Sequence, residues 1–158
     1  MSTILVLASN SFTGSHFVHH ALQKGYSVIG ISRSEEYNSV MLPYKYKNNN
    51  IKKFSFFKLD VNHNLDQILS IIDKAKPVYV ANFVAQGEVR NSWQNPEQWY
   101  QTNCMSIVKL SNELSKRDYI KKYLTSSTPE VYGSTDKDLA ENHNYFPSTP
   151  YAASKLSG

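Results

Sequence analysis

The chain has 158 residues, which is enough for one domain with a packed core and too few for two domains of ordinary size. Hydrophobic residues make up 41% of the sequence and charged residues 19%, and this composition excludes a disordered or fibrous protein. The net charge of +4 favours anionic ligands without requiring nucleic acid, and we expect no nucleic acid partner.

Cysteine and histidine usage indicates the compartment and argues against a metal site. Cys104 is the only cysteine, so an internal disulfide and a cysteine-based zinc site are both excluded. The five histidines have no acidic or cysteine partners at ligand spacing, and we expect no bound metal. The apolar residues 4–8 are too few for a membrane span and lack the basic start of a signal peptide. We therefore expect a cytoplasmic protein that does not bind a membrane.

Apolar runs of strand length alternate along the chain with segments of helical spacing. Strands, each apolar on both faces, are expected at residues 4–7, 27–32, 54–59, 78–83 and 123–126. Helices are expected between the first two strands, ending near Gly25, then over residues 65–72, and in a longer segment that Pro96 begins. Residues 34–53 should be a long loop or irregular helix, and residues 134–149 a second loop.

This alternation of elements predicts an α/β fold. Strands that are buried on both faces and separated by helices form a doubly wound parallel sheet, here in the order 3-2-1-4-5. In such a sheet, ligands bind at the carboxyl ends of the strands, so the segments that follow each strand are the candidate site.

The turn after the first strand carries small residues at three-residue intervals, Ala8, Ser11 and Gly14. Small side chains let the backbone approach a pyrophosphate, and the N-terminus of the following helix offers N–H donors and partial positive charge. The turn resembles the TGxxGxxG segment of short-chain dehydrogenases, with Ala8 and Ser11 at its first two glycine positions. A strand-to-helix turn without a ligand is the alternative.

The second strand ends at Ser32-Arg33, where a domain that prefers NAD usually has an acidic residue. A guanidinium could pair with the ribose phosphate of NADP, and Arg33 resembles an arginine of the GDP-mannose 4,6-dehydratases. The alternative is a solvated loop arginine with Glu35 and Glu36 beside it.

Four further segments occur in an order typical of one enzyme family. Residues 82–86 (Asn-Phe-Val-Ala-Gln) resemble N-x-A-A-Q, and residues 102–103 match T-N. Residues 125–133 are similar to S-S-[ST]-x-x-V-Y-G, and residues 151–155 (Tyr-Ala-Ala-Ser-Lys) match Y-x-x-x-K. Over essentially its whole length the chain therefore resembles the extended short-chain dehydrogenases/reductases that act as nucleotide-sugar epimerases and dehydratases. This resemblance implies a Rossmann-type NAD(P)-binding domain.

The resemblance assigns four catalytic residues. Tyr151 would be the base, and Lys155, four residues later on the same helical face, would stabilise the phenolate and hold the cofactor ribose. Thr128 takes the position of the serine or threonine that hydrogen-bonds the hydroxyl being oxidised. Glu130 lies where 4,6-dehydratases keep the glutamate that removes a proton from carbon 5, although Pro129 replaces the aspartate of the dTDP-glucose enzymes. A solvated Glu130 near a strand end is the alternative.

The implied cofactor is NADP by preference, or NAD. Asp60 and Val61 would contact the adenine, although Asp60 is equally typical of a turn at a strand end. The full set of expected cofactor contacts comprises Ala8, Asn10, Ser11, Phe12, Thr13, Gly14, Ser32, Arg33, Asp60, Val61, Phe83, Val84, Ala85, Asn103, Ser126, Tyr151 and Lys155.

The implied reaction is that of a nucleotide-sugar 4,6-dehydratase, with a 4-epimerase or reductase of the same superfamily as the alternative. A non-catalytic nucleotide-binding fragment is the third possibility, favoured by the lost glycines. Extended enzymes of this family are about twice as long, so residues 1–158 would be an incomplete Rossmann domain without the sugar-binding domain, inactive alone. A homodimer through helices near residues 97–116 and 150–158 is also expected.

Overall fold

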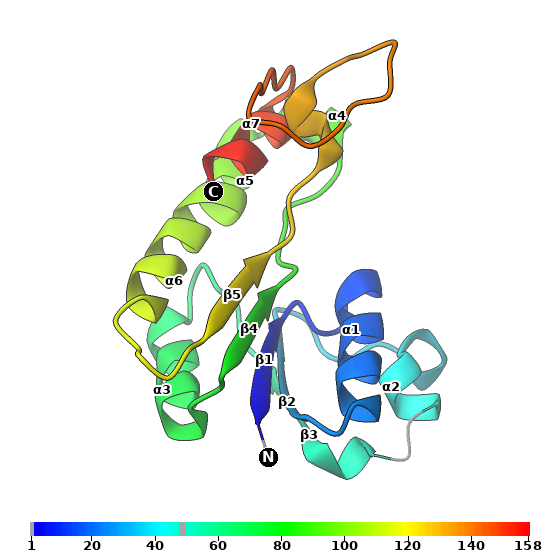
Figure 1. Cartoon of the computed structure of the whole chain (residues 1–158), viewed down its shortest axis with the longest axis vertical. Coiled ribbons are helices and arrows are strands. Elements are labelled where there is room, and N and C mark those ends of the chain that lie inside the picture. The colour runs from blue at the N-terminus through cyan, green and yellow to red at the C-terminus, as the bar shows by residue number, and fades with distance from the viewer. Residues whose placement is uncertain (1, 48–49) are drawn as a thin grey trace. The chain divides into compact units, whose positions relative to one another are not determined.

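Helices and strands alternate along the computed structural model, which describes residues 2–47 and 50–158 (Figure 1). The first part contains β1 (Thr3–Leu7), α1 (Phe12–Gln23), β2 (Ser27–Ser32), η1 (Ser39–Met41), α2 (Pro43–Tyr46), η2 (Ile51–Lys53), β3 (Phe54–Lys58) and α3 (Leu65–Ala75). The second part contains β4 (Tyr79–Asn82), α4 (Val89–Ser92), α5 (Pro96–Tyr100), the π-helical turn η3 (Gln101–Met105), α6 (Ser106–Leu114), β5 (Lys122–Thr125), η4 (Pro129–Tyr132) and α7 (Pro150–Ser157).

The five strands form one parallel sheet in the order β3-β2-β1-β4-β5, which confirms the predicted order and the doubly wound α/β fold. Leu7, the last residue of β1, pairs in register with Ile31 of β2 and with Asn82 of β4. The carboxyl ends of these three strands therefore lie at one edge, where the fold predicts ligand binding.

Contacts divide the chain into two compact units. The first contains the described residues up to Val84 together with Ser111–Thr125, and hence the whole sheet. The second contains Ala85–Leu110 and Ser126–Gly158, with α4, α5, η3, η4 and α7.

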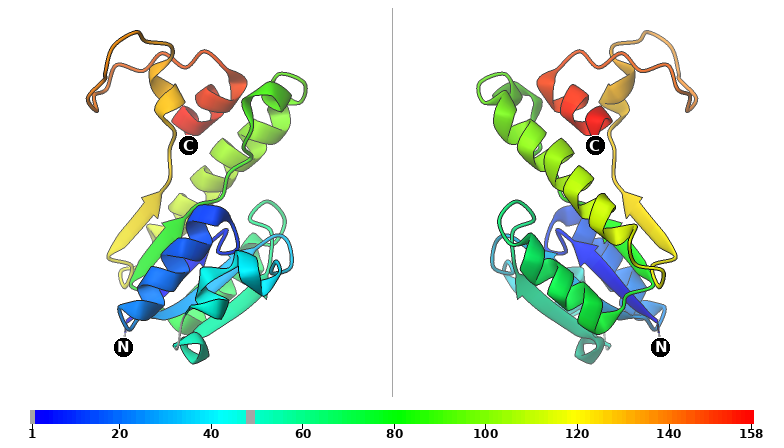
Figure 2. Two further views of the ribbon diagram at one scale, coloured as in Figure 1. Left: turned by 90° about the vertical axis from the view of Figure 1, so that its right-hand side faces the viewer. Right: turned by 90° about the vertical axis from the view of Figure 1, so that its left-hand side faces the viewer.

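The core of the first unit follows the two-residue period of its central strand. Ile4 and Val6 of β1 pack in one cluster with Val18 and Leu22 of α1 and with Tyr44 of α2. The intervening Leu5 and Leu7 are also buried, and they point to the opposite face because side chains alternate along a strand. In the first unit, α1 and α2 cover one face and α3 the other (Figure 2). Each such side chain contributes about 1.5–3 kcal/mol by its removal from water.

One predicted feature of the strands needs correction. β3 and β5 are not apolar on both faces: Ser55 and Phe57 of β3 are exposed, as are Lys122 and Leu124 of β5. Both strands lie at the ends of the sheet order, where one side lacks a neighbouring strand and helical cover is incomplete. The described residues of the segment 34–53 contain three short helical turns, in agreement with the predicted loop or irregular helix, and Asn48 and Asn49 lie outside the described residues. Residues 134–149 contain no helix or strand, as predicted.

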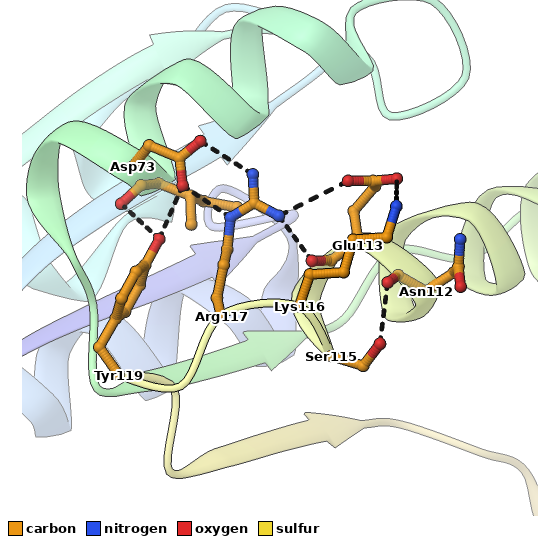
Figure 3. A network of polar contacts seen from close by, with 8 residues as sticks. Asp73, Asn112, Glu113, Ser115, Lys116, Arg117 and Tyr119 are labelled. Atoms are coloured by element: carbon orange, nitrogen blue, oxygen red, sulfur yellow. Dashed lines mark hydrogen bonds and ion pairs between the residues drawn. The ribbon is translucent and has the colours of Figure 1, made fainter.

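A polar network ties α3 to the segment after α6 within the first unit (Figure 3). Nε and Nη2 of Arg117 donate to the two carboxylate oxygens of Asp73 at 2.7 and 2.8 Å, and the Tyr119 hydroxyl donates to Asp73 at 2.8 Å. The hydrogen bond from Arg117 is the main reason that the pKa of Asp73 lies below its ordinary value. None of the helices in the described part of the chain is long and apolar enough to cross a membrane.

Candidate functional site

The turn after β1 is built around a serine that replaces a glycine. Ser11 has an extended backbone (φ −69°, ψ 166°), so its position does not require glycine. Its hydroxyl accepts a hydrogen bond from the Gly14 N–H at 3.1 Å and donates to the Ala8 carbonyl at 2.8 Å. Ser11 therefore caps the N-terminus of α1 and closes the turn. Ala8 adopts a left-handed conformation, with φ at 58°.

Gly14 is the position in this turn where only glycine fits. A Cβ atom there would clash with the Ala8 carbonyl oxygen, so glycine lets α1 begin directly against the end of β1. Phe12 and Thr13, at the start of α1, are exposed. The turn therefore presents an accessible helix N-terminus with small neighbours at the carboxyl edge of the sheet, which fits a pyrophosphate.

The end of β2 is joined to this turn by buried polar groups. The Ser32 hydroxyl accepts from the Asn10 N–H at 3.1 Å and lies 3.3 Å from the Ser9 hydroxyl. All three of these residues are buried. Arg33, the next residue, is exposed at the same edge.

The two carboxylates after Arg33 are engaged by other residues. Glu35 forms an ion pair with Lys58 at 3.0 Å. Glu36 forms an ion pair with Lys45 at 2.9 Å and accepts a hydrogen bond from the buried Tyr44 hydroxyl at 2.8 Å. Burial, first, and the bond to Glu36 raise the pKa of Tyr44. Both acids thus have cationic partners of their own.

The segments after β3 and β4 carry further residues of the predicted cofactor set. Asp60 forms a turn: its carboxylate accepts from the Asn62 N–H at 2.8 Å, and Val61 lies within that turn. Phe83 is half-buried with its ring 5.3 Å from the ring of Phe17. The Val84 N–H donates to the Asn82 side chain at 3.0 Å.

Asn82 also donates to the Tyr123 hydroxyl at 2.9 Å, which links β4 to β5. Burial raises the pKa of Tyr123. Ala85, the next predicted cofactor contact, is an exposed residue of the second unit.

In the second unit, α7 carries the Tyr-Lys pair. The Thr149 hydroxyl accepts from the Ala152 N–H at 3.0 Å and caps the helix, so that α7 begins at Pro150. Tyr151 and Lys155 consequently lie one turn apart on one face of α7. The Tyr151 N–H donates to the buried Ser92 hydroxyl at 3.2 Å, which attaches the start of α7 to α4.

Lys155 is only 7% exposed. Its Nζ donates to the Ser126 carbonyl oxygen at 2.6 Å, so the predicted contacts Lys155 and Ser126 meet each other. Burial of the ammonium lowers the pKa of Lys155.

Asn103 lies in the π-helical turn and is completely buried. Its side chain accepts from the Gln86 N–H at 2.7 Å and donates to the Gln86 carbonyl at 3.0 Å. It also donates at 3.0 Å to the Ser154 hydroxyl, which in turn donates to the Tyr151 carbonyl at 2.7 Å. Asn103 therefore holds α7 against the segment after β4.

Sequence reasoning missed Ser92 and Ser154, which position α7. The available signal for Ser154 was its spacing, because a residue three positions after Tyr151 lies on the same helical face. No comparable pattern marked Ser92.

The two other catalytic candidates lie at η4, Thr128 directly before it and Glu130 within it, and η4 contacts α7 in the second unit. The Thr128 side chain caps η4 by accepting from the Glu130 N–H at 3.4 Å. Glu130 is half-buried. The second unit thus contains all four predicted catalytic residues. Over residues 2–47 and 50–158, no cluster of three or more His, Cys, Asp or Glu residues could hold a metal ion.

Comparison with known proteins shows similarity over almost the entire chain. Protein CapI of Staphylococcus aureus is 30% identical over 157 residues, which cover 98% of this chain and 46% of that protein. A dTDP-glucose 4,6-dehydratase from Bacillus anthracis, solved in complex with NAD, is 27% identical with a TM-score of 0.78, covering 99% of this chain and 48% of the other.

A UDP-N-acetylglucosamine 4-epimerase from Methanobrevibacter ruminantium, solved with UDP-N-acetylmuramic acid, is 28% identical with a TM-score of 0.81 and covers 99% of this chain and 47% of the other. The chain spans about half the length of the relatives it matches. The family model described as GDP-mannose 4,6 dehydratase matches residues 5–158, and the chain therefore belongs to this family of nucleotide-sugar dehydratases and epimerases.

Proposed function

We propose that the chain is the nicotinamide-binding part of a nucleotide-sugar 4,6-dehydratase and carries its catalytic side chains. The observation that supports this proposal is the placement of a carboxylate, Glu130, on η4 in contact with the helix that carries Tyr151 and Lys155. A 4,6-dehydratase needs a second base besides its tyrosine, whereas a 4-epimerase does not.

The residues of the first unit fit a dinucleotide. The Gly14 contact brings the N-terminus of α1 against β1, and the exposed Arg33 follows a strand end that lacks an acidic residue. We propose NADP as the preferred cofactor, because the strand end offers Ser32 and Arg33 in place of an acidic residue and a guanidinium can bind phosphate through two N–H groups. When bound, the nicotinamide would take a hydride from carbon 4 of the sugar and return it to carbon 6.

The cofactor preference is tested by substituting Arg33. Arg33→Ala should weaken NADP binding in titration calorimetry much more than NAD binding, since only NADP carries the ribose phosphate. Equal losses of affinity for NADP and NAD would show that Arg33 does not bind the ribose phosphate.

The chain's own residues perform the proton transfers in this proposal. Tyr151 removes the proton of the carbon 4 hydroxyl, Thr128 hydrogen-bonds that hydroxyl, and the Lys155 ammonium stabilises the phenolate. The ketone at carbon 4 acidifies carbon 5. Glu130 then removes the carbon 5 proton, and the carbon 6 hydroxyl leaves with that proton as water, which gives a 4-keto-5,6-ene. Return of the hydride to carbon 6 and addition of a proton from water at carbon 5 would complete the 4-keto-6-deoxy sugar nucleotide.

The structural similarity to a UDP-N-acetylglucosamine 4-epimerase keeps epimerisation as the second candidate. Glu130→Gln in the full-length protein separates the two, because it preserves size and removes the proton acceptor. With GDP-mannose or dTDP-glucose, formation of the keto product and deuterium uptake at carbon 5 should fall by roughly 10² to 10⁴, while the cofactor absorbance change on adding sugar survives.

Glu141→Gln, an exposed acid of the same unit, is the matched control and should behave as the native protein. Formation of the keto product at the normal rate by Glu130→Gln would contradict the proposed role of Glu130 and favour an epimerase or reductase.

We also propose a cytoplasmic homodimer formed through the helical segment near residues 97–116, which contains α5, η3 and α6, and through α7. Tyr100 of α5, Met105 of η3 and Leu156 of α7 are 39%, 44% and 37% exposed, and a second copy would bury this apolar surface. Sedimentation equilibrium should give a dimer for the full-length protein and a weaker one for Met105→Lys. A monomer at all concentrations would end the proposal.

A further inference from the structure

The Asn10 side chain joins the turn after β1 to the loop after β2. Its amide nitrogen lies 2.9 Å from the Glu35 carbonyl oxygen and 3.2 Å from both the carbonyl oxygen and the hydroxyl of Ser34, and it donates to these acceptors. Asn10 is only 6% exposed, so these bonds form largely out of water.

The residues on the other side of Arg33 are held by the same turn. The Asn10 backbone N–H donates to the Ser32 hydroxyl at 3.1 Å, and the Ser9 N–H donates to the Ile31 carbonyl at 3.2 Å. The chain on both sides of Arg33 is therefore bonded to Ser9 and Asn10, two consecutive residues of the turn, with the bond at Ser32 made through its side-chain hydroxyl.

We propose that Asn10 is a positioning residue that sets the discrimination between a phosphorylated and an unphosphorylated adenosine ribose. This inference rests on the proposed cofactor site. A guanidinium binds phosphate through two parallel N–H groups, so its affinity depends on where its backbone is held. An amide is needed at position 10, because a carboxylate or an aliphatic side chain cannot donate to the two carbonyl oxygens.

Asn10→Asp tests the inference, with NADP and NAD as probes because they differ only by the ribose phosphate. Titration calorimetry on the full-length protein should show NADP binding weakened by about tenfold or more and NAD binding by less than about threefold. Backbone amides of residues 33–36 should exchange with deuterium faster in the variant, which a loss of charge complementarity alone would not produce.

Asn38→Asp is the matched control, since it adds the same charge in the same loop. The Asn38 side chain accepts from the Val40 N–H at 3.2 Å, and aspartate preserves that acceptor. This variant should keep the native ratio of the two affinities.

The outcomes separate the two levels of the proposal. If the native protein binds neither cofactor, the cofactor site itself is wrong. If it binds both and Asn10→Asp leaves their ratio unchanged, or Asn38→Asp shifts the ratio equally, Asn10 does not set discrimination. Should circular dichroism show Asn10→Asp unfolded, Asn10→Ser, which also removes the amide donors, takes its place under the same criteria.

Discussion

The buried ammonium of Lys155 should lower the stability of the folded chain at neutral pH. Its hydrogen bond to the Ser126 carbonyl, being charge-assisted, contributes about 1.5–3 kcal/mol, whereas removal of an ammonium from water costs several kcal/mol. The lowered pKa of Lys155 means that the cost of burial wins, at about 1.4 kcal/mol for each unit of pKa. Lys155→Met keeps an unbranched apolar stem and removes the charge. We expect it to stabilise the fold by about 1 kcal/mol, or roughly 2–4 °C in Tm.

The pH dependence identifies the cause of this gain. A depressed lysine carries its full penalty below its folded-state pKa, and the penalty disappears as the pH rises towards the ordinary value of 10.5. Urea unfolding followed by circular dichroism should therefore show the Lys155→Met advantage at pH 7 and a smaller one near pH 10. Lys109→Met, at an exposed position, should change stability by less than about 0.5 kcal/mol at both. A Lys155→Met variant that is less stable than the native chain at pH 7, or a difference independent of pH, would refute the reasoning.

Three further substitutions test the turn and the surface network. Ala8→Gly should raise the free energy of unfolding in urea by about 0.5–1 kcal/mol, because Ala8 has φ at 58° and glycine relieves the left-handed strain. An unchanged free energy of unfolding would show that the turn compensates for this strain. Gly14→Ala should cost about 1–3 kcal/mol in the same assay, since its Cβ would meet a backbone oxygen, and native stability would contradict that packing. Asp73 has a pKa lowered chiefly by Arg117, so its contribution to stability is present above the ordinary value of 3.8 and is lost as the pH falls through the lowered value. Asp73→Asn should flatten the acid limb of a plot of urea midpoint against pH, and an unaltered limb would assign the acid response to other carboxylates.

The sheet could be predicted because the apolar runs of strand length and the segments of helical spacing between them indicate the same order of elements. The strand at Ser27–Ser32 has the expected bounds, and the order β3-β2-β1-β4-β5 is the one typical of a doubly wound sheet with helices on both faces. The edge strands were the exception. A run such as Phe54–Lys58 is apolar enough to resemble a central strand, and only its place in the sheet decides which side chains are exposed.

The candidate site was predictable as a set of motifs but not as a set of contacts. Spacing placed Tyr151 and Lys155 on one helical face, because that relation is local. The bonds that Asn103 makes to Gln86 and Ser154 join residues that are 17 and 51 positions apart in the sequence. No periodic pattern in the sequence indicates which residues so far apart come into contact. Asp60 shows the same limit, because its carboxylate forms the turn after β3 and the sequence left this alternative open.

The π-helical turn Gln101–Met105 has a consequence for how the chain tolerates changes in length. A π-turn accommodates an extra residue within an α-helix, so that the flanking α-helical segments need not rotate by the roughly 100° that an added residue otherwise imposes. Loss of one residue here would let the helix close into a regular one, with Trp99 and Leu110 still on the buried side. The fold would survive such a deletion, whereas Asn103 would be withdrawn from Gln86 and Ser154. A change of length in this segment would thus leave the fold unchanged and would alter only the attachment of α7.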